Sequence, residues 1–367
     1  MNTKFDYIDS DAQLIAFSDN ISNAKWLAVD TEFMRERTYY AQLALIQIAS
    51  EEGNALIDVP ALSSLQPLVD AFTRTDCLKI MHSASQDLEV LHQSMGAMPA
   101  PLFDTQLAAS FLGEADQIAY GAIVKQRLGV ELDKDQTRTN WLQRPLSPAQ
   151  LGYAELDVLY LYTLYEQLLA ELEAADRIIW VEDESQALAD KTLSGTDVDQ
   201  AWKRVKSINR LNASQQHVAR ALSKWREERA QSRDLPREWV LKKQAIIGLA
   251  KFQPGSTRDM IDIEGLHAKQ IQRMGNMLIR LVQQAAAEPA DVQAEPEAEL
   301  TGEQRGQAKK IMARLRQIGD EQRIAPALIA NRNAIEQLVL GQRDIALLDG
   351  WRAQVAGREL LEILETL

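Results

Sequence analysis

Two carboxylates, Asp30 and Glu32, stand two residues apart at the end of an apolar run in "KWLAVDTEFM", residues 25–34. The run "WLAV" that precedes them is typical of a buried strand. Positions i and i+2 of a strand lie on the same face, about 6.6 Å apart, so both carboxylates would project from one side. Charged groups at the end of a buried strand are costly without a partner, and this arrangement suits neighbouring divalent cations.

Asp87 and Asp157 extend this acidic set from two further segments. Asp87 lies in "HSASQDLEVL", near the start of a predicted helix, and Asp157 lies in "GYAELDVLY", where Tyr153 shares its helical face. Four carboxylates, with no group of cysteines and no HExxH motif, favour Mg²⁺ or Mn²⁺ over Zn²⁺. Two such ions about 3.5–4 Å apart would suit in-line attack on a phosphodiester.

The segments around these carboxylates alternate between strand and helix patterns. Short β-rich runs occur at "WLAVDT", "LALIQIA", "NALIDV" and "LKIMH", and helical patterns occur at "LSSLQPLVDAF" and "SQDLEVLHQSM". Helices are also expected over "GAIVKQRLG" and, as one long helix, over residues 147–175, with Ser147 at the N-cap and Pro148 in the first turn. The alternation predicts an α/β sheet covered by helices.

From about residue 208 the strand patterns stop, and amphipathic helices follow that Pro and Gly residues separate. The segment "AAAEPADVQAEPEAE", residues 285–299, is rich in Ala, Glu and Pro and predicts a solvated linker. Residues 235–265 and 324–350 share a pattern: a Pro near the start of a helix, an apolar helix, and a short helix ending at Gly265 or Gly350. We expect an α/β domain over 1–201, related all-α domains over 208–287 and 301–367, and a linker over 288–300.

The net charge of −13 is unevenly divided along the chain. Residues 1–201 carry 13 Lys and Arg against 32 Asp and Glu, whereas residues 202–280 carry 17 against 7. Most charged helical surfaces are merely solvated, but a net charge of +10 with Trp202, Trp225 and Trp239 interspersed indicates contact with a nucleic-acid backbone. An acidic part is thus joined to a strongly basic one.

The single cysteine, Cys77, excludes an intramolecular disulfide and fits a buried small hydrophobic residue. No apolar run approaches the ~20 residues that a membrane span requires, and the first residues lack the apolar centre of a signal peptide. We therefore expect a cytoplasmic protein without a membrane partner.

Three segments, "DTEF" at 30–33, "QDLEVL" at 86–91 and "YAELD" at 153–157, resemble in order and spacing the motifs of DEDD exonucleases of the Tyr-containing subgroup. The blocks "TYYAQLALIQIA", "LFDTQLAA", "GLHAKQ" and "TRTNWLQRPLSPAQLGYAELDV" extend the resemblance over nearly the whole chain, to members with two C-terminal HRDC domains. It implies a ribonuclease-H-like α/β exonuclease domain, a mixed sheet with flanking helices, followed by two all-α HRDC domains. Ala41 stands where the family usually has Pro, and Lys243 stands where HRDC domains often have an acidic residue. Neither residue belongs to the expected metal site.

The resemblance also implies roles for the acidic set. Asp30, Glu32, Asp87 and Asp157 would ligate two divalent metal ions, Mg²⁺ or Mn²⁺, and Tyr153 would position the attacking water. A Tyr hydroxyl with an ordinary pKa near 10 is a poor base at neutral pH, which favours orientation of the water as its role.

Other residues are candidates for contact with RNA. Phe33 could stack on the terminal base, and ordinary core packing is its alternative. His82 could meet the RNA end, but we favour a hydrogen-bonded histidine at a strand end. For Asp104 we favour a helix N-cap over a supporting role beside the metal site. Four cations of the basic part complete the candidates: Lys203, Arg204, Lys242 and Lys243.

Together these expectations describe 3′-to-5′ hydrolysis of RNA that releases nucleoside 5′-monophosphates. The resemblance adds the trimming of 3′ extensions on tRNA precursors and other small stable RNAs. The expected partner is RNA with a free single-stranded 3′ end, and the family expectation is a monomer. Two alternatives stay open: a DNA 3′-to-5′ exonuclease with the same metal site, and a catalytically silent nucleic-acid-binding scaffold. The presence of all four carboxylates weighs against the scaffold.

Overall fold

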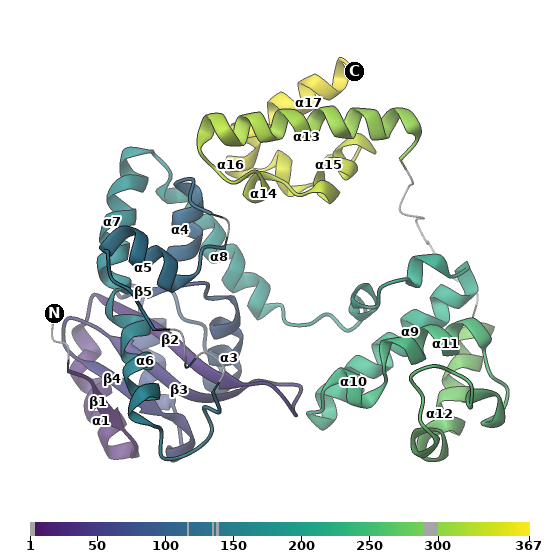
Figure 1. Ribbon diagram of the computed structural model, residues 1–367, viewed down its shortest axis with the longest axis horizontal. Coiled ribbons are helices and arrows are strands. Elements are labelled where there is room, and N and C mark those ends of the chain that lie inside the picture. Colours follow the sequence, from purple (N-terminus) through teal and green to yellow (C-terminus); the bar gives the residue numbers. More distant parts are fainter. Residues whose placement is uncertain (1–3, 116, 134–135, 137–138, 289–299) are drawn as a thin grey trace. The chain divides into compact units, whose positions relative to one another are not determined.

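The computed structural model describes residues 4–115, 117–133, 136, 139–288 and 300–367 (Figure 1). Its internal contacts divide the chain into two compact units. The first comprises residues 1–34, 43–193 and 300–367, and the second comprises residues 35–42 and 194–299. Among the described residues, none of the helices combines the length and apolar character that crossing a membrane requires.

A mixed sheet forms the centre of the first unit (Figure 1). Its strands, in the order β1-β4-β3-β2-β5-β6, are β1 (Asp6–Ile8), β2 (Trp26–Met34), β3 (Gln42–Ala49), β4 (Asn54–Asp58), β5 (Leu78–Met81) and β6 (Leu102–Asp104). Strand β3 runs antiparallel to β4, whereas β2 and β6 both run parallel to β5. The four strands predicted from sequence are confirmed, and the three-residue strands β1 and β6 are additional.

Eight α-helices lie in the same part of the described chain: α1 (Asp11–Asn20), α2 (Gln66–Thr73), α3 (Ser85–Met95), α4 (Thr105–Phe111), α5 (Tyr120–Leu128), α6 (Pro148–Leu159), α7 (Leu161–Ala174) and α8 (Ile178–Leu193). The prediction of one helix over 147–175 is wrong, because α6 ends at Leu159 and α7 begins at Leu161. Tyr160 between them has φ near −100° and ψ near −5°, displaced from the values of a regular α-helix. The Tyr120 hydroxyl donates to the Leu156 carbonyl in the last turn of α6 at 3.1 Å, which helps the helix to end there.

Residues 300–367 form a helical group that packs within the first unit. Its helices are α13 (Gly302–Gln322), α14 (Pro326–Ile329), α15 (Arg332–Val339), α16 (Gly350–Arg352) and α17 (Arg358–Glu365), with a π turn over Ala353–Gly357. The Trp351 ring meets the Phe111 ring edge-on with centroids 5.0 Å apart. The Trp351 indole donates to Glu184 of α8 at 3.0 Å, and Arg352 forms an ion pair with the same carboxylate. This group therefore shares a hydrophobic core with α4, α7 and α8.

The second unit is helical and repeats the order of elements found in residues 300–367. It contains α9 (Ala213–Arg233), α10 (Arg237–Val240), α11 (Lys243–Phe252) and α12 (Ala268–Ala287). Both α9 and α13 have 21 residues, and a four-residue helix follows each of them. Residues 285–287 of the predicted linker belong to α12, and residues 289–299 lie outside the described part.

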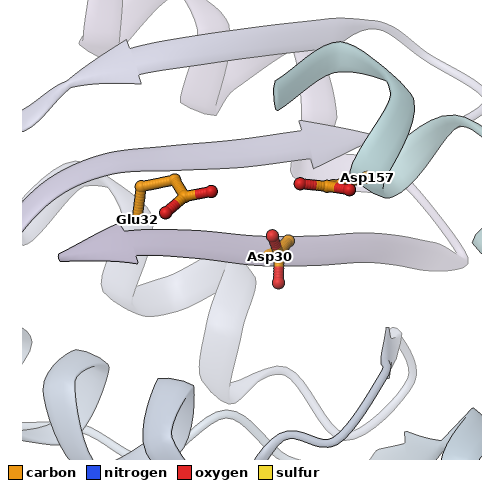
Figure 2. Close-up of side chains that lie close together, drawn as sticks. All are labelled: Asp30, Glu32 and Asp157. Atoms are coloured by element: carbon orange, nitrogen blue, oxygen red, sulfur yellow. The ribbon is translucent and has the colours of Figure 1, made fainter. Parts of the chain in front are cut away.

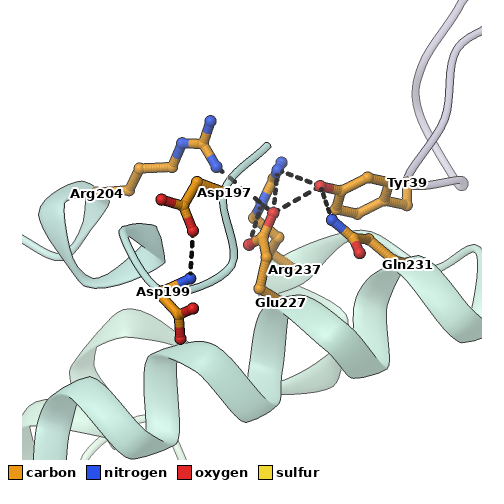
Figure 3. A network of polar contacts seen from close by, with 7 residues as sticks. All are labelled: Tyr39, Asp197, Asp199, Arg204, Glu227, Gln231 and Arg237. Carbon is orange, nitrogen blue, oxygen red and sulfur yellow. Dashed lines mark hydrogen bonds and ion pairs between the residues drawn. The ribbon is translucent and has the colours of Figure 1, made fainter. Parts of the chain in front are cut away.

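Loop residues 35–41 belong to the second unit because they contact α9 and α10. Asp234, at the C-terminal end of α9, accepts hydrogen bonds from the backbone N–H groups of Tyr39 and Tyr40 at 2.9 and 3.0 Å. The Tyr39 hydroxyl donates to buried Glu227 at 2.6 Å, and Glu227 also pairs with Arg237 at 2.6 Å (Figure 3). Glu227 and the Tyr39 hydroxyl thus satisfy each other away from water, whereas Arg237 and Asp234 keep access to it.

Candidate active site

Strand β2 carries the first two carboxylates in the middle of the sheet, between β3 and β5. Leu27, Ala28 and Val29 are fully buried, as expected for a central strand. Asp30 and Glu32 follow them on one face of the strand (Figure 2). The sheet therefore fixes the backbone from which both carboxylates project.

Helix α6 supplies Asp157 to the same place. Its first turn is fixed by a capping box in which Ser147 and Gln150 bond to each other's backbone N–H groups. Buried Val158 packs with side chains of β2 and β5, and buried Ala154 packs with side chains of β3 and β4. The helix is thus held against the sheet on both sides of Asp157.

Asp30, Glu32 and Asp157 bring one carboxylate oxygen each within 4.8 Å of one another (Figure 2). These three predicted ligands converge from a strand and a helix that are more than a hundred residues apart in the chain. In the part of the chain that the structure describes, the cluster consists of oxygen donors only. Such a donor set suits Mg²⁺ or Mn²⁺ better than Zn²⁺.

Asp87 stands next to this cluster, in the first turn of α3. It is 8% exposed, and the Thr31 hydroxyl donates a hydrogen bond to its Oδ1 atom. The helix N-terminus favours negative charge at this position. Asp87 is outside the group of three that meets within 4.8 Å, but its charge contributes to raising the pKa of Asp30 and of Glu32.

Burial and mutual repulsion hold the pKa values of all four carboxyl groups above their ordinary range. Burial, followed by the charges of Asp157 and Asp87, raises the pKa of Glu32 to about 9. Burial is also the main reason why the pKa values of Asp87 and Asp157 rise to about 7, and why that of Asp30 is raised strongly. Divalent cations would remove the repulsion, so the residues present fit a metal centre.

Tyr153 lies one turn before Asp157 on α6. A hydrogen bond from its hydroxyl stabilises the ionised Asp157 carboxylate and partly offsets the effect of burial on the pKa of that group. The Tyr153 and Trp141 ring centroids are 6.1 Å apart, which restricts the ring from the side. The hydroxyl therefore lies beside the carboxylate cluster.

Asp104 has the helix-capping role favoured from sequence, and a further role that is close to the supporting role given as its alternative. Its side chain caps α4 by accepting from the N–H groups of Gln106 and Leu107. It also accepts from the N–H groups of Ser83 and Ala84, at 3.0 and 2.8 Å, in the turn before α3. Asp104 thereby fixes the start of the helix that carries Asp87.

Thr31, the donor to Asp87, is a residue that the sequence analysis missed. Its position between Asp30 and Glu32 in "DTEF" was the available signal. A hydroxyl there can orient a neighbouring carboxylate without adding charge.

The two aromatic candidates for RNA contact lie in different environments. Phe33 is half-buried on β2. His82 uses both ring nitrogens within the protein, with Thr105 Oγ1 and the Ile118 carbonyl each at 2.9 Å. The His82 contacts match the hydrogen-bonded histidine that we favoured.

The four cationic candidates lie in the second unit. Lys203 and Arg204 belong to a 3₁₀ turn, Ala201–Arg204, where the Lys203 ammonium lies 5.9 Å from the Trp202 ring centroid and Arg204 lies 3.4 Å from Glu227. Lys242 occupies the N-cap position of α11 without a capping hydrogen bond from its side chain, and Lys243 is the first residue of that helix. Lys203, Arg204 and Lys243 are exposed, which suits contact with phosphate groups.

Comparison with known protein families gives two matches. A 3′-5′ exonuclease family model matches residues 5–173, and an HRDC domain model matches residues 215–282. The predicted α/β exonuclease domain and the first HRDC domain are thereby confirmed.

Similar proteins span nearly the full chain. A ribonuclease D of Shewanella sp. (strain ANA-3) is 35% identical over 369 residues, covering 98% of this chain and 94% of that protein. A ribonuclease D of Pseudomonas paraeruginosa is 35% identical over 371 residues, covering 98% and 97%. The crystal structure of Escherichia coli RNase D, described as an exoribonuclease involved in structured RNA processing, has a TM-score of 0.91 at 30% identity and covers 100% of this chain.

Proposed function

The chain belongs to the ribonuclease D family of 3′-to-5′ exoribonucleases, and from this premise we propose that Asp87 and the three clustered carboxylates beside it hold two Mg²⁺ or Mn²⁺ ions for RNA hydrolysis. The meeting of Asp30, Glu32 and Asp157 oxygens within 4.8 Å, with Asp87 beside them, is the observation that carries the proposal. When bound, the two ions would assist deprotonation of the attacking water and departure of the 3′ oxygen.

The carboxylates and Tyr153 have separate roles in the reaction. Asp30, Glu32, Asp87 and Asp157 would hold the ions as ionised carboxylates, so cation binding would compete with the protonation that burial and mutual repulsion favour by raising their pKa values. The Tyr153 hydroxyl, fixed beside Asp157, orients the water for attack on phosphorus. A phosphorus–oxygen bond to water forms as the bond to the 3′ oxygen breaks. The products are a nucleoside 5′-monophosphate and an RNA shortened by one residue.

The proposed substrate is RNA with an unpaired 3′ end, including the 3′ extensions of tRNA precursors. The Escherichia coli relative is described as acting in structured RNA processing, which supports this choice.

We assign the exonuclease domain to residues 1–201, HRDC domains to 208–287 and 301–367, and the linker to 288–300. The repeated order of helices supports the second HRDC domain. Lys203, Arg204, Lys242 and Lys243 would contact RNA phosphates, and Phe33 would lie near the RNA end. For His82 we keep the structural role, because both of its ring nitrogens are bonded within the protein.

The test is hydrolysis of a 5′-labelled RNA with an unpaired 3′ tail, followed on a denaturing gel. With Mg²⁺ or Mn²⁺ the full chain should give a ladder that shortens one nucleotide at a time, and EDTA should stop it. Asp157→Ala should abolish the ladder, whereas Glu155→Ala on the same helix should retain it, because Glu155 is outside the cluster.

The absence of shortening with any divalent metal, despite tight binding of RNA, would contradict the proposal and favour a nucleic-acid-binding scaffold. Faster shortening of a matched DNA would favour a DNA exonuclease instead. Cleavage of circular RNA, which has no 3′ end, would exclude an exonuclease mechanism.

A further inference from the structure

Gln47 is a fully buried amide in the middle of β3. Its side chain is 0% exposed, and neither its Oε1 nor its Nε2 atom forms a hydrogen bond with any residue in the described part of the chain. An amide can donate and accept several hydrogen bonds, and burying it without them costs free energy that an apolar side chain would not cost. The stability of the fold therefore does not explain an amide at this position.

The residues around Gln47 place it beneath α6. Strand β3 lies between β2 and β4, and α6 contacts both of these strands, so the helix crosses over β3. Gln47 is paired with Leu56 of β4, and cross-strand partners project from the same face of a sheet. Leu56 belongs to the same apolar cluster as Ala154 of α6. The Gln47 amide therefore lies on the face of the sheet that α6 covers.

Asp30 projects from this same face, on the neighbouring strand. Ala28 of β2 and Ala49 of β3 belong to one apolar cluster that includes a side chain of α6. Side chains alternate along a strand, so Asp30 follows Ala28 on that face. Gln47 precedes Ala49 on it for the same reason. Because the loop over residues 35–41 joins β2 to β3, the next side chain toward that loop is Asp30 on one strand and Gln47 on the other.

The burial of Gln47 decides how it could take part in the reaction. A side chain with no exposed surface does not touch RNA, so it acts only through its neighbours. An amide N–H group can orient a carboxylate without adding charge to a cluster that is already crowded with carboxylates. Hydrogen bonds of this kind fix the orientation of metal ligands and contribute to the affinity for the metal.

We propose that Gln47 is a positioning residue of the active site, whose Nε2 group donates a hydrogen bond to the Asp30 carboxylate when that carboxylate binds a divalent cation. This inference rests on the proposed function, because it assigns Gln47 to the same metal centre. The hydrogen bond holds the carboxylate in one orientation. The unsatisfied amide destabilises the cation-free protein, and the same amide stabilises the cation-bound protein.

The first test is calorimetric titration of the full chain with Mn²⁺ in the absence of RNA. Gln47→Met keeps the length of the side chain and removes both of its polar groups. It should weaken Mn²⁺ binding roughly 10- to 100-fold, the usual effect of losing a hydrogen-bond partner of a metal ligand. Gln106→Met is the matched control, because the Gln106 amide donates to the Ile118 carbonyl at 3.0 Å and lies outside the cluster. It should bind Mn²⁺ as the wild type does.

Thermal unfolding distinguishes positioning from a structural role. In EDTA, Gln47→Met should unfold at the wild-type temperature or above it, because an apolar side chain replaces an unsatisfied amide. Gln106→Met should unfold at a lower temperature, because it loses a hydrogen bond. At one fixed Mn²⁺ concentration, the rise in unfolding temperature should be smaller for Gln47→Met than for wild type, since weaker binding stabilises less. Gln47→Leu provides a second apolar replacement should methionine pack poorly.

Shortening of RNA supplies the last readout. Gln47→Met should require a higher Mn²⁺ concentration for half-maximal turnover, while its affinity for RNA in EDTA equals that of wild type. Gln106→Met should match wild type in both measurements.

Equal Mn²⁺ affinity of Gln47→Met and wild type would overturn the inference, as would equal losses in Gln47→Met and Gln106→Met. Lower unfolding temperatures in EDTA for both apolar variants of Gln47 would also overturn it, because the amide would then be satisfied within the cation-free chain. Failure of the proposed function has a different result. A wild-type chain that binds Mn²⁺ more tightly than Gln47→Met, yet shortens no RNA, would keep the role of Gln47 and lose the nuclease.

Discussion

At the scale of single residues, the carboxylate cluster shows which chemistry could be read from sequence. The spacing of Asp30 and Glu32 on one strand face defined two positions, and the "YAELD" segment added Asp157 and Tyr153. Thr31 was not singled out from sequence, and the two roles of Asp104 were treated as alternatives, because a hydroxyl or carboxylate reveals its hydrogen-bond partner only after folding. The polar atoms that orient the ligands are therefore harder to find than the ligands.

The Tyr153 hydroxyl provides the first prediction at this scale. Tyr153→Phe should slow turnover about 100-fold, because the water loses one oriented hydrogen-bond partner, while affinity for RNA in EDTA stays the same. Single-turnover kinetics separate the two effects. Tyr162→Phe, which removes a hydroxyl from α7 outside the cluster, should retain turnover. Unchanged turnover in Tyr153→Phe would remove this residue from the mechanism.

Glu227 provides the second prediction, because its carboxylate is fully buried. Burial alone would raise the pKa of Glu227, but hydrogen bonds from Arg237 and Tyr39 outweigh that effect and hold the pKa below its ordinary value. Glu227→Gln should lower the free energy of unfolding by about 2 kcal/mol, less than for a wholly buried pair because Arg237 keeps some access to water.

The pH dependence of that loss follows from the lowered pKa. The folded state holds the Glu227 proton less tightly than the unfolded state, so its contribution is present above the unfolded pKa of about 4.3 and disappears as the pH falls through the folded pKa. Chemical unfolding at neutral pH should separate Glu227→Gln from wild type, and the curves should converge in acid. Glu228→Gln, at the exposed neighbouring position, should change little at either pH.

At the scale of elements, the hydrophobic periodicity of the sequence predicted those strands and helices that are long enough to show a repeating pattern. Strands β2 to β5 were found, whereas β1 and β6 have three residues each and too few positions to show alternation. The apolar pattern over residues 147–175 continued through Tyr160 and concealed the break between α6 and α7. At that break the Leu156 carbonyl accepts a tertiary hydrogen bond from Tyr120, which a local pattern does not contain.

The end of α13 provides a prediction for which the helix contains its own control. Arg323 has φ of 52°, the Ile324 N–H donates to the Gly319 carbonyl at 2.9 Å, and α9 ends in the same way with Ala230 in place of Gly319. A Cβ atom on Gly319 would lie 2.7 Å from the Pro326 ring and 2.9 Å from the Ile324 carbonyl oxygen. Pro326 has no counterpart after α9, where Arg237 occupies the equivalent position, which explains why Ala230 is accommodated.

Gly319→Ala should therefore lower the free energy of unfolding by about 1–3 kcal/mol through overpacking. Gly306→Ala, in the same helix with open space around it, should raise that free energy by about 0.5–1 kcal/mol, because alanine favours the helix. Thermal unfolding of both variants measures the difference. Two changes of the same sign would show that helix propensity, and not the contact with Pro326, determines the effect.

At the scale of the whole molecule, composition predicted the division of charge but not the grouping of contacts. Tyr39 bonds to Glu227, 188 residues away, and Trp351 bonds to Glu184, 167 residues away. Neither pair has a local signature, because hydrophobic periodicity reports only on neighbours within one helix or strand. The predicted order of domains along the chain is compatible with two compact units, of which the first includes residues 300–367 and the second includes residues 35–42. Sequence patterns alone could not reveal which segments belong to which unit.

The division of charge leads to the last prediction. The catalytic part is acidic and residues 202–280 carry a net charge of +10, so the basic part should supply most of the affinity that does not depend on RNA sequence. Replacing Lys203, Lys242 and Lys243 with Gln in the full chain should lower the salt dependence of RNA binding in EDTA by roughly 2 in log–log slope, about 0.7 per cation. Lys25→Gln with Lys191→Gln, at exposed positions of the acidic part, is the control and should leave the slope unchanged. An equal change in slope per lysine in the two variants would mean that RNA responds to net charge alone, and the division of labour between the two parts would be wrong.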